Sequence, residues 1–324
     1  MTTIERLDPN NDDQFAEYHA AYLASLVEEW DRPYSAREKR AQLLDDTGYV
    51  DVVAVIARND EGVAVGTGYL ETPLRDNLTL GYIGVTVVPE HRRQGHGTAL
   101  LEAFADLARE RGRTTLFAEA RWPADEERSG HTLFAEANGF RLDLTDAHRV
   151  LFLPASLPEA PVRDGYTLRG WRGKCPEEWL DQYAVLLSLI VQEAPSGDYP
   201  LENEYFDAAR IRADEALLRR QGRQMQVSVA LAPDGTLAGH TQLVFPESDP
   251  GDVYQWDTLV LREHRGHGLG LTLKVHAMQS SKDLLEGHSH VHTYNAVANE
   301  PMIAVNELMG FRVVAYNGEF IREL

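Results

Sequence analysis

Apolar residues follow a helical period near the start of the chain and alternate with polar residues in the segments around it. Phe15, Tyr18, Tyr22 and Leu26 recur at the three-to-four-residue spacing of a helix. The runs TIERL, DVVAVIAR and VAVGTGYLET have the composition of β-strands. The turn NDEG joins the last two runs, so these strands are expected to pair antiparallel. Between the first helix and these strands, the pattern predicts a second helix at about 35–45.

A strand, a basic turn with spaced glycines, a helix, a strand and a helix ending in Gly-Phe then follow, and this series occurs twice. The first series runs from Val85 to Phe140 with the turn RRQGHG, and the second from Thr258 to Phe311 with the turn RGHGLG. The offset is much longer than the period of a solenoid repeat. The sequence therefore predicts a duplicated domain.

A proline-rich segment separates the two copies. Pro154, Pro158 and Pro161 cannot lie inside a helix and favour an extended connector. We therefore predict an N-terminal domain at 1–153, a linker at 154–165 and a C-terminal domain at 166–324. Hairpin-linked strands should pair antiparallel and the central strand–helix–strand units parallel. The expected fold class is α/β (α+β), with a mixed central sheet flanked by helices in each domain.

Charge and composition narrow the classes of partner and compartment. The chain carries 51 acidic and 31 basic residues, a formal net charge of −20, which repels nucleic acids and anionic membranes and attracts cations. Its apolar runs are too short to span a membrane and its N-terminus does not resemble a signal peptide, so we expect a cytoplasmic protein. Cys175 is the only cysteine, which excludes an intrachain disulfide and a cysteine-based metal site. For this residue, packing is favoured over a nucleophilic role.

The repeated turn is a candidate anion site. In Arg92-x-x-Gly95-x-Gly97 and Arg265-x-x-Gly268-x-Gly270 a strand ends and a helix begins, so unpaired backbone N–H groups converge. The glycines let a ligand approach the backbone, and a phosphate or pyrophosphate suits the site. A plain turn is the alternative. Neither copy has the spacing of a Walker A loop or of a dinucleotide-binding fingerprint.

Both turn segments resemble the acetyl-CoA-binding motif of the GCN5-related N-acetyltransferases (GNAT), Gln/Arg-x-x-Gly-x-Gly/Ala. The segment NEPMIAVNELMGF resembles the second motif of this family, and HTLFAEANGF is its weaker counterpart. The resemblance implies transfer of an acetyl group from acetyl-CoA to an amine, with pyrophosphate on the turn and pantetheine along the central strand. The implied acetyl-CoA-binding residues are Val87, Val88, Arg92, Arg93, Gln94, Gly95, His96, Gly97 and Thr98 in the first copy, and Val260, Leu261, Arg265, Gly266, His267, Gly268, Leu269, Gly270 and Asn299 in the second.

The chemistry needs a base, because an acceptor amine is protonated at neutral pH. Glu119 is the candidate in the first copy, where the family resemblance implies a catalytic glutamate. Asp257 on the central strand is the candidate in the second, which also offers Tyr294. A solvated position for Glu119 and a sheet-pairing role for Asp257 are equally open. The position of the family's frequent acid tyrosine holds Ala135 and Asn306.

Three alternating histidines precede Tyr294. His288, His290 and His292 share one face of the predicted strand. Such a pattern can bind zinc, but the sequence offers no evident carboxylate ligand nearby, and our expectation includes no metal. Packing, or a role in lining the acceptor cleft together with Tyr294, is favoured instead.

The leading hypothesis is a tandem N-acetyltransferase that acts on a small cationic amine, either as a monomer or as a homodimer. The acidic residues Glu193, Asp198, Glu202, Glu204 and Asp207 are candidates for attracting such an acceptor, with an ordinary solvated helix entrance as the alternative. The C-terminal copy is favoured as the active one, because its second motif is better formed and Asp257 is available. A protein lysine acetyltransferase and a non-catalytic acyl-CoA-binding module are the alternatives.

Overall fold

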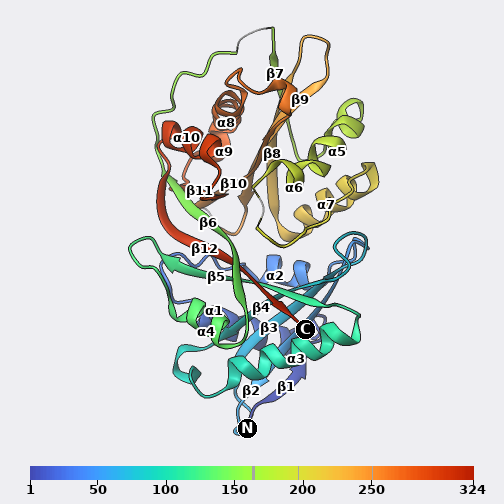
Figure 1. The fold of residues 1–324 in the computed structure, drawn as a ribbon, viewed down its shortest axis with the longest axis vertical. Helices are drawn as coiled ribbons and strands as arrows, with labels where there is room; N and C mark the ends of the chain where they lie inside the picture. The colour runs from blue at the N-terminus through green and yellow to red at the C-terminus, as the bar shows by residue number, and fades with distance from the viewer. Residues whose placement is uncertain (163–164, 196, 250) are drawn as a thin grey trace. The chain divides into compact units, whose positions relative to one another are not determined.

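The computed structural model describes residues 1–162, 165–195, 197–249 and 251–324 and divides the chain into two mixed α/β units (Figure 1). The first unit contains Met1–Leu144 and Asn317–Leu324, and the second contains Thr145–Tyr316. The predicted fold class is confirmed, because each unit has mostly antiparallel strands, one parallel pair at its centre and helices packed on the strands.

The first unit follows the predicted order of elements. Its strands lie in the order β1-β2-β3-β4-β5, antiparallel except for the parallel pair β4–β5. Phe15, Tyr18 and Leu43 bring α1 and α2 to one face, while Phe104 brings α3 close to β3. The elements are β1 (Thr3–Arg6), α1 (Asp12–Ser25), α2 (Ala36–Leu43), β2 (Val50–Arg58), β3 (Ala64–Pro73), β4 (Leu80–Val87), η1 (Pro89–His91), α3 (His96–Glu110), β5 (Thr115–Pro123) and α4 (Gly130–Ala137).

The second unit repeats this arrangement. Its strands lie in the order β6-β11-β10-β9-β8-β7, antiparallel except for the parallel pair β10–β11. The elements are β6 (Arg141–Phe152), which begins in the first unit, β7 (Thr167–Arg172), η2 (Glu177–Trp179), α5 (Leu180–Ser188), α6 (Ile190–Glu193), α7 (Ala208–Gln221), β8 (Arg223–Leu231), β9 (Leu237–Pro246), β10 (Asp252–Val260), η3 (Arg262–His264), α8 (Leu269–Ser280), α9 (Lys282–Leu285), β11 (His290–Ala296), α10 (Glu300–Met309) and β12 (Arg312–Glu323), which ends in the first unit.

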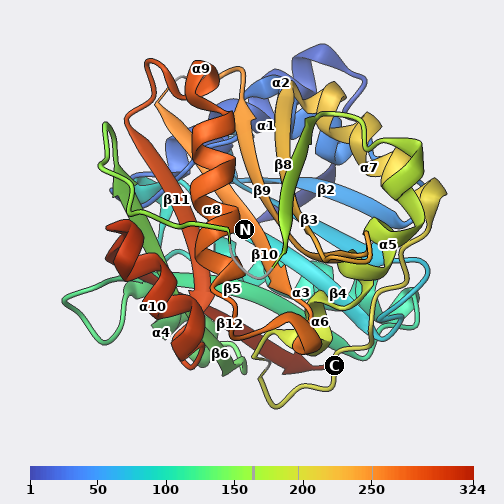
Figure 2. The ribbon, with the colours of Figure 1, turned by 90° about the horizontal axis from the view of Figure 1, so that it is seen from above.

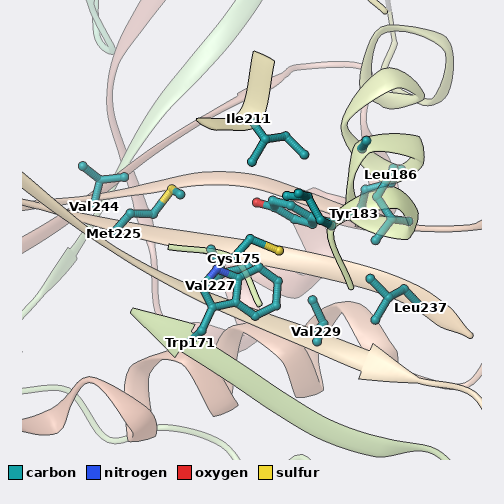
Figure 3. Packing of buried hydrophobic residues seen from close by; sticks show 13 residues of the cluster. Trp171, Cys175, Tyr183, Leu186, Ile211, Met225, Val227, Val229, Leu237 and Val244 are labelled. Atoms are coloured by element: carbon teal, nitrogen blue, oxygen red, sulfur yellow. The ribbon is translucent and has the colours of Figure 1, made fainter. Parts of the chain in front are cut away.

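Apolar side chains alternate between the two faces of the sheet in the second unit, and different helices pack on each face. Met225, Val227 and Val229 point to the side of α5 and α7, where they form a core with Trp171 and Tyr183 (Figure 3). The next residue, Ala230, points the other way and packs against Leu269 and Leu273 of α8. Figure 2 accordingly shows α8 on one side of β8, β9 and β10 and α5 and α7 on the other. The two faces of this sheet are therefore separately covered, as a strand period of two requires.

The last strand of each repeat belongs to the unit of the other repeat. Strand β6 pairs antiparallel with β11, from Asp146↔Ala296 to Phe152↔His290. The end of β12 lies beside β5, where the N–H of Leu324 donates to the carbonyl oxygen of Thr114 at 2.9 Å. The boundaries of the two units, at 144/145 and 316/317, therefore differ from the expected domains at 1–153 and 166–324. Without this exchanged strand, β5 and β11 would each leave a row of backbone groups unpaired.

The predicted linker 154–165 has no helix or strand in its described part, 154–162 and 165, and residues 163 and 164 lie outside the described residues. Its apolar side chains are nevertheless ordered on the second unit. Ala155, Leu157 and Ala160 pack against the cluster that includes Leu151, Val275 and Phe311. The segment from Ala155 to Ala160 is thus attached to this core.

Candidate functional site

The parallel strands at the centre of each unit separate along their length. Among the described residues, the β4–β5 pairing runs from Leu80↔Thr115 to Ile83↔Ala118, and the β10–β11 pairing from Asp252↔His290 to Tyr254↔His292. All four strands continue for several residues beyond these pairs. Each unit therefore has an opening between its two central strands, next to the glycine turn.

The two turns have the same backbone geometry. Gly95 and Gly268 cap α3 and α8 in the left-handed conformation, with φ of 89° and 74°. Two residues earlier, Arg93 and Gly266 also have positive φ, 63° and 85°. Alternating left- and right-handed residues turn successive N–H groups toward one point, which favours an anion. A Cβ placed on Gly95, Gly266 or Gly268 would meet no protein atom within 4 Å, so the space beside each turn is open.

The first arginine of each turn motif, Arg92 or Arg265, holds the turn to the end of the central strand. Arg92 Nε donates to the carbonyl oxygen of Val87 at 3.0 Å, and Arg265 Nε donates to that of Val260 at 3.1 Å. Arg265 also forms an ion pair with Glu193. The predicted role of these arginines in acetyl-CoA binding is thus accompanied by a structural one, in which they position the backbone that would bind the pyrophosphate.

Several other predicted acetyl-CoA residues have partners within the protein. His96 is buried and its Nδ1 lies 2.9 Å from Thr2 Oγ1. Gln94 donates to the carbonyl oxygen of Glu90, and Thr98 Oγ1 donates to Asn138 Oδ1.

Three of the residues predicted to bind acetyl-CoA in the second unit also contact the protein. Leu269 is buried against β8 and β9, and the ring of His267 lies 5.3 Å from that of Tyr166. Asn299 caps α10, because its Oδ1 accepts from the N–H of Met302 at 3.2 Å. Among these residues, Leu269 is buried, so only its backbone is left to meet a ligand.

The central strand of the second unit contains a β-bulge that the first unit lacks. Relative to β9, the register shifts between Gln255↔Leu243 and Thr258↔Thr241, so Trp256 and Asp257 share one residue of the partner strand. The pairing of β4 with β3 is regular from Tyr82 to Val87. A bulge redirects the side chain and frees a backbone N–H. In this chain the bulge includes the predicted base, Asp257, and lies at the opening between the two central strands.

Asp257 has the environment of a proton acceptor. Its side chain reaches solvent, yet protein surrounds it closely enough that burial, together with the negative charge of Glu204, raises its pKa to about 6. Among the described residues it has no hydrogen-bond or ion-pair partner. A carboxylate held this way is mostly ionised at neutral pH and is still basic enough to take a proton.

Glu119 in the first unit has a different environment. Its side chain is 51% exposed and lies 3.7 Å from Arg121 Nη2. On the neighbouring strand, a Cβ at Gly84 would lie 2.3 Å from the ring of Tyr69, so this partly buried tyrosine fills the space beside the strand. Glu119 is thus a surface carboxylate with a cationic neighbour, which favours the solvated alternative over the catalytic one.

Tyr294 belongs to a cluster of aromatic and histidine side chains in the second unit. Its ring stacks on His148 at 4.4 Å, and His148 Nε2 lies 2.9 Å from His292 Nδ1. His290 Nδ1 and His292 Nε2 each lie 3.0 Å from Asp252 Oδ1. The expectation that no carboxylate lies near these histidines is therefore wrong. Asp252 is 38 residues away in sequence, and only the parallel register brings it there.

The position of the family's acid tyrosine is occupied by a buried polar chain. Asn306 Oδ1 accepts from Lys274 Nζ at 2.7 Å, and Asn306 Nδ2 donates to Asn295 Oδ1 at 3.0 Å. Lys274 is 1% exposed, and burial lowers its pKa to about 7. The sequence signal for this buried chain was Lys274, a charged residue at the helix position where the first copy has Leu101. Sequence reasoning missed this signal.

The acidic segment before α7 is partly neutralised within the unit. Glu193 pairs with Arg262 and Arg265, Glu204 pairs with Arg210, and Asp207 caps α7. These contacts fix the segment beside β10, where Glu204 acts on Asp257.

Comparison with known proteins agrees with the geometry. The model of the acetyltransferase (GNAT) family matches residues 15–139 and 189–311, which is more than half of the chain. A tandem GNAT protein from the clavulanic acid biosynthesis pathway is 26% identical, with a TM-score of 0.83, and the match covers 100% of this chain and 98% of that one. A GCN5-related N-acetyltransferase from Sphaerobacter thermophilus is 18% identical, with a TM-score of 0.66 and coverage of 99% and 95%.

A search of curated proteins gave no match. Among the described residues, no helix combines the length and the apolar composition that crossing a membrane requires. Members of the matched family are acetyltransferases whose domains bind acetyl-CoA as co-substrate, and both turns described above fit its pyrophosphate. With two separated strand pairs, two anion-binding turns and two matches to one family model, the chain belongs to the acetyltransferase (GNAT) family and contains two copies of its domain.

Proposed function

We propose that the second unit transfers an acetyl group from acetyl-CoA to the amine of a small, cationic acceptor, with Asp257 as the base. The observation that carries the proposal is the placement of an unpaired carboxylate, with a pKa raised to about 6, on a β-bulge at the strand opening. The first unit, with Tyr69 filling the corresponding space and Glu119 at the surface, would bind acetyl-CoA or support the fold without turnover.

The residues of the second unit divide the reaction between them. The turn from Arg265 to Gly270 holds the pyrophosphate, and the backbone of Val260 and Leu261 aligns the pantetheine arm. Asp257 takes a proton from the acceptor ammonium, directly or through one water, and the free amine attacks the thioester carbonyl. N–H groups at the bulge face the developing oxyanion. The tetrahedral intermediate then breaks its carbon–sulfur bond to release the CoA thiolate, and the nitrogen loses its second proton to solvent. An asparagine amide is not an acid and Asn306 is already bonded to Lys274 and Asn295, so the thiolate takes its proton from solvent.

A cationic acceptor is supported by the net charge of −20 and by the acidic segment beside Asp257. The same charge disfavours nucleic acids and anionic membranes as partners. The assay described below also tests two alternative functions. A protein lysine acetyltransferase would prefer peptide substrates over free amines, and a non-catalytic module would bind acetyl-CoA without turnover.

The test measures CoA release with a thiol reagent against a panel of amines and lysine peptides. Cys175 adds little background, because it is buried and burial raises its pKa to about 12. We expect Asp257→Asn to lower kcat/KM at least tenfold, since a positioned base contributes roughly 10² to 10⁴. Glu119→Gln is the matched control and should change the rate less than twofold. Equal rates for Asp257→Asn and the unchanged protein would overturn the assignment of the base.

The pH profile gives a second readout. Because the base must be ionised, kcat/KM should fall an additional tenfold per pH unit below about pH 6, and this extra slope should be absent in Asp257→Asn.

Gly95→Glu and Gly268→Glu then identify the active unit. Both glycines have positive φ and open space beside them, so the two changes impose similar backbone strain while each places a negative charge in one turn. Loss of turnover in Gly268→Glu alone supports the proposal, and loss in Gly95→Glu alone overturns it.

A further inference from the structure

Asp252, His290 and His292 form a compact set of ligand atoms at the start of β10 and β11. This set lies outside the turn and does not include Asp257. The parallel register places Asp252 directly opposite His290, and His292 follows two residues later on the same face of β11. The backbone ladder of the two strands therefore fixes all three side chains relative to one another.

The ligand atoms are close enough together to bind one ion. His290 Nδ1 and His292 Nε2 each lie 3.0 Å from Asp252 Oδ1, and all three ligand atoms lie within 4.8 Å of one another. Zinc binds nitrogen and oxygen ligands at about 2.0–2.2 Å, which places neighbouring ligands about 3.3 Å apart in a tetrahedron. The two nitrogen–oxygen distances are thus a few tenths of an ångström short of this spacing, and the two nitrogens, which lie within 4.8 Å of each other, would meet it by rotation of the imidazoles about their side-chain bonds, with no change in the strands.

The surroundings orient one ligand and leave another accessible. His292 is 0% exposed, and its second nitrogen, Nδ1, lies 2.9 Å from Nε2 of the buried His148. A partner on the second ring nitrogen is the usual support of a metal-bound histidine, because it fixes the ring and the tautomer. His290 is 35% exposed, with one face against Phe152, so an ion can reach the set from solvent.

The alternative is a purely hydrogen-bonded cluster, in which Asp252 Oδ1 accepts from both imidazoles. The His148–His292 contact is compatible with either arrangement. Without an ion, His148 Nε2–H donates to His292 Nδ1, and His292 Nε2–H donates to Asp252. With an ion on His292 Nε2, the proton lies on Nδ1 and is donated to His148 Nε2. The cluster can thus change from one state to the other by moving protons alone.

We propose that Asp252, His290 and His292 bind a zinc ion or a similar late divalent transition metal, with His148 as the supporting residue and water at the fourth position. Two imidazoles and one carboxylate suit zinc, cobalt and nickel better than magnesium or calcium, which prefer oxygen ligands. The ion would join the starts of β10 and β11, whose other ends separate at the acetyl-CoA opening. Its proposed role is structural, so it does not depend on the proposed acetyl transfer.

The test uses the full chain without a histidine tag, freed of metal by a chelator and dialysis. Titration with Zn²⁺ in a calorimeter should show about one site per chain with micromolar or tighter affinity. Co²⁺ should give the intense visible absorption of a tetrahedral site. Zn²⁺ should also raise the unfolding temperature, because a ligand that binds only the folded state stabilises it.

His290→Ala and His288→Ala are the matched pair. Both residues lie in the same short segment, but His288 packs against Phe245 instead of joining the ligand set. We expect His290→Ala to weaken Zn²⁺ binding at least tenfold and to abolish the thermal shift, and His288→Ala to preserve both. His290 is the most exposed of the three ligands, so its loss should leave the metal-free fold intact, which the melting curve without metal checks. Absence of Zn²⁺ binding to the unchanged protein, or equal binding by the two variants, would overturn the proposal.

Discussion

Replacement of Lys274 with leucine should stabilise the second unit near neutral pH although it removes a hydrogen bond. The Lys274 amine is buried, donates to Asn306 at 2.7 Å, and has its pKa lowered by burial to about 7. The corresponding position of α3, four residues after the last turn glycine, is the buried Leu101. A leucine is therefore compatible with this position of the motif, and the main energetic difference between the two side chains is the charge.

The free energy by which the charge of Lys274 destabilises the fold follows from the linkage between protonation and folding. The unfolded chain binds a proton at the ordinary lysine pKa of 10.5, whereas the folded state binds one only near pH 7. The destabilisation is therefore complete below about pH 7, declines as the pH rises, and vanishes above 10.5. Its full size is about 5 kcal/mol, at 1.36 kcal/mol per pH unit. Against it, the leucine leaves Asn306 Oδ1 without its lysine donor, at a cost of about 1–3 kcal/mol that does not vary with pH.

The assay is urea unfolding of both proteins at pH 7.5 and pH 9.5, with hydrogen exchange in α8 to report on the second unit. The stabilisation by Lys274→Leu should be about 2–3 kcal/mol smaller at the higher pH, because the amine is then closer to neutral in the unfolded chain as well. Lys282→Gln, at an exposed position of the neighbouring α9, should show no such difference. A stabilisation that is the same at both pH values would refute the lowered pKa of Lys274.

Two further predictions concern the turns. Gly97→Ala should lower the stability of the first unit by about 1–3 kcal/mol, because the new Cβ would lie 2.9 Å from the ring of Phe134. Gly270→Ala places a Cβ 3.8 Å from its nearest neighbour, so it should leave the unfolding temperature nearly unchanged. Glu193→Gln should raise the KM for acetyl-CoA a few-fold and leave kcat nearly unchanged, because the ion pair that holds Arg265 is lost; an unaltered KM would show that this pair does not position the turn.

The features that depend on local sequence could be predicted. Glycine spacing, a β-branched run before it and an amphipathic helix after it determine a strand, a turn and a helix within some thirty residues. The family resemblance and the fold class follow from having this series twice, and Gly95 and Gly268 take the left-handed conformation that their positions require. Asp257 could be selected for the same reason, since it lies on the central strand just before the turn.

The features that depend on register could not be predicted. The bulge at Trp256 and Asp257 comes from pairing with β9, and Asp252 reaches His290 only through the parallel ladder of β10 and β11. The exchange of β6 and β12 is likewise a choice of partner strand. Each has the alternating pattern of an ordinary last strand, and that pattern does not specify the edge with which it pairs.

Because of the strand exchange, the two repeats of the sequence are not two independent sheets. In the second unit, the strand beside β11 is β6, which the sequence assigns to the first repeat. This strand supplies His148, the support of His292 and the stacking partner of Tyr294, as well as Leu151 in the core beneath α8 and α10. The residues 166–324 alone therefore lack one strand of their own sheet and one member of the histidine cluster. The first repeat therefore completes the sheet of the second unit, whether or not its own turn takes part in chemistry.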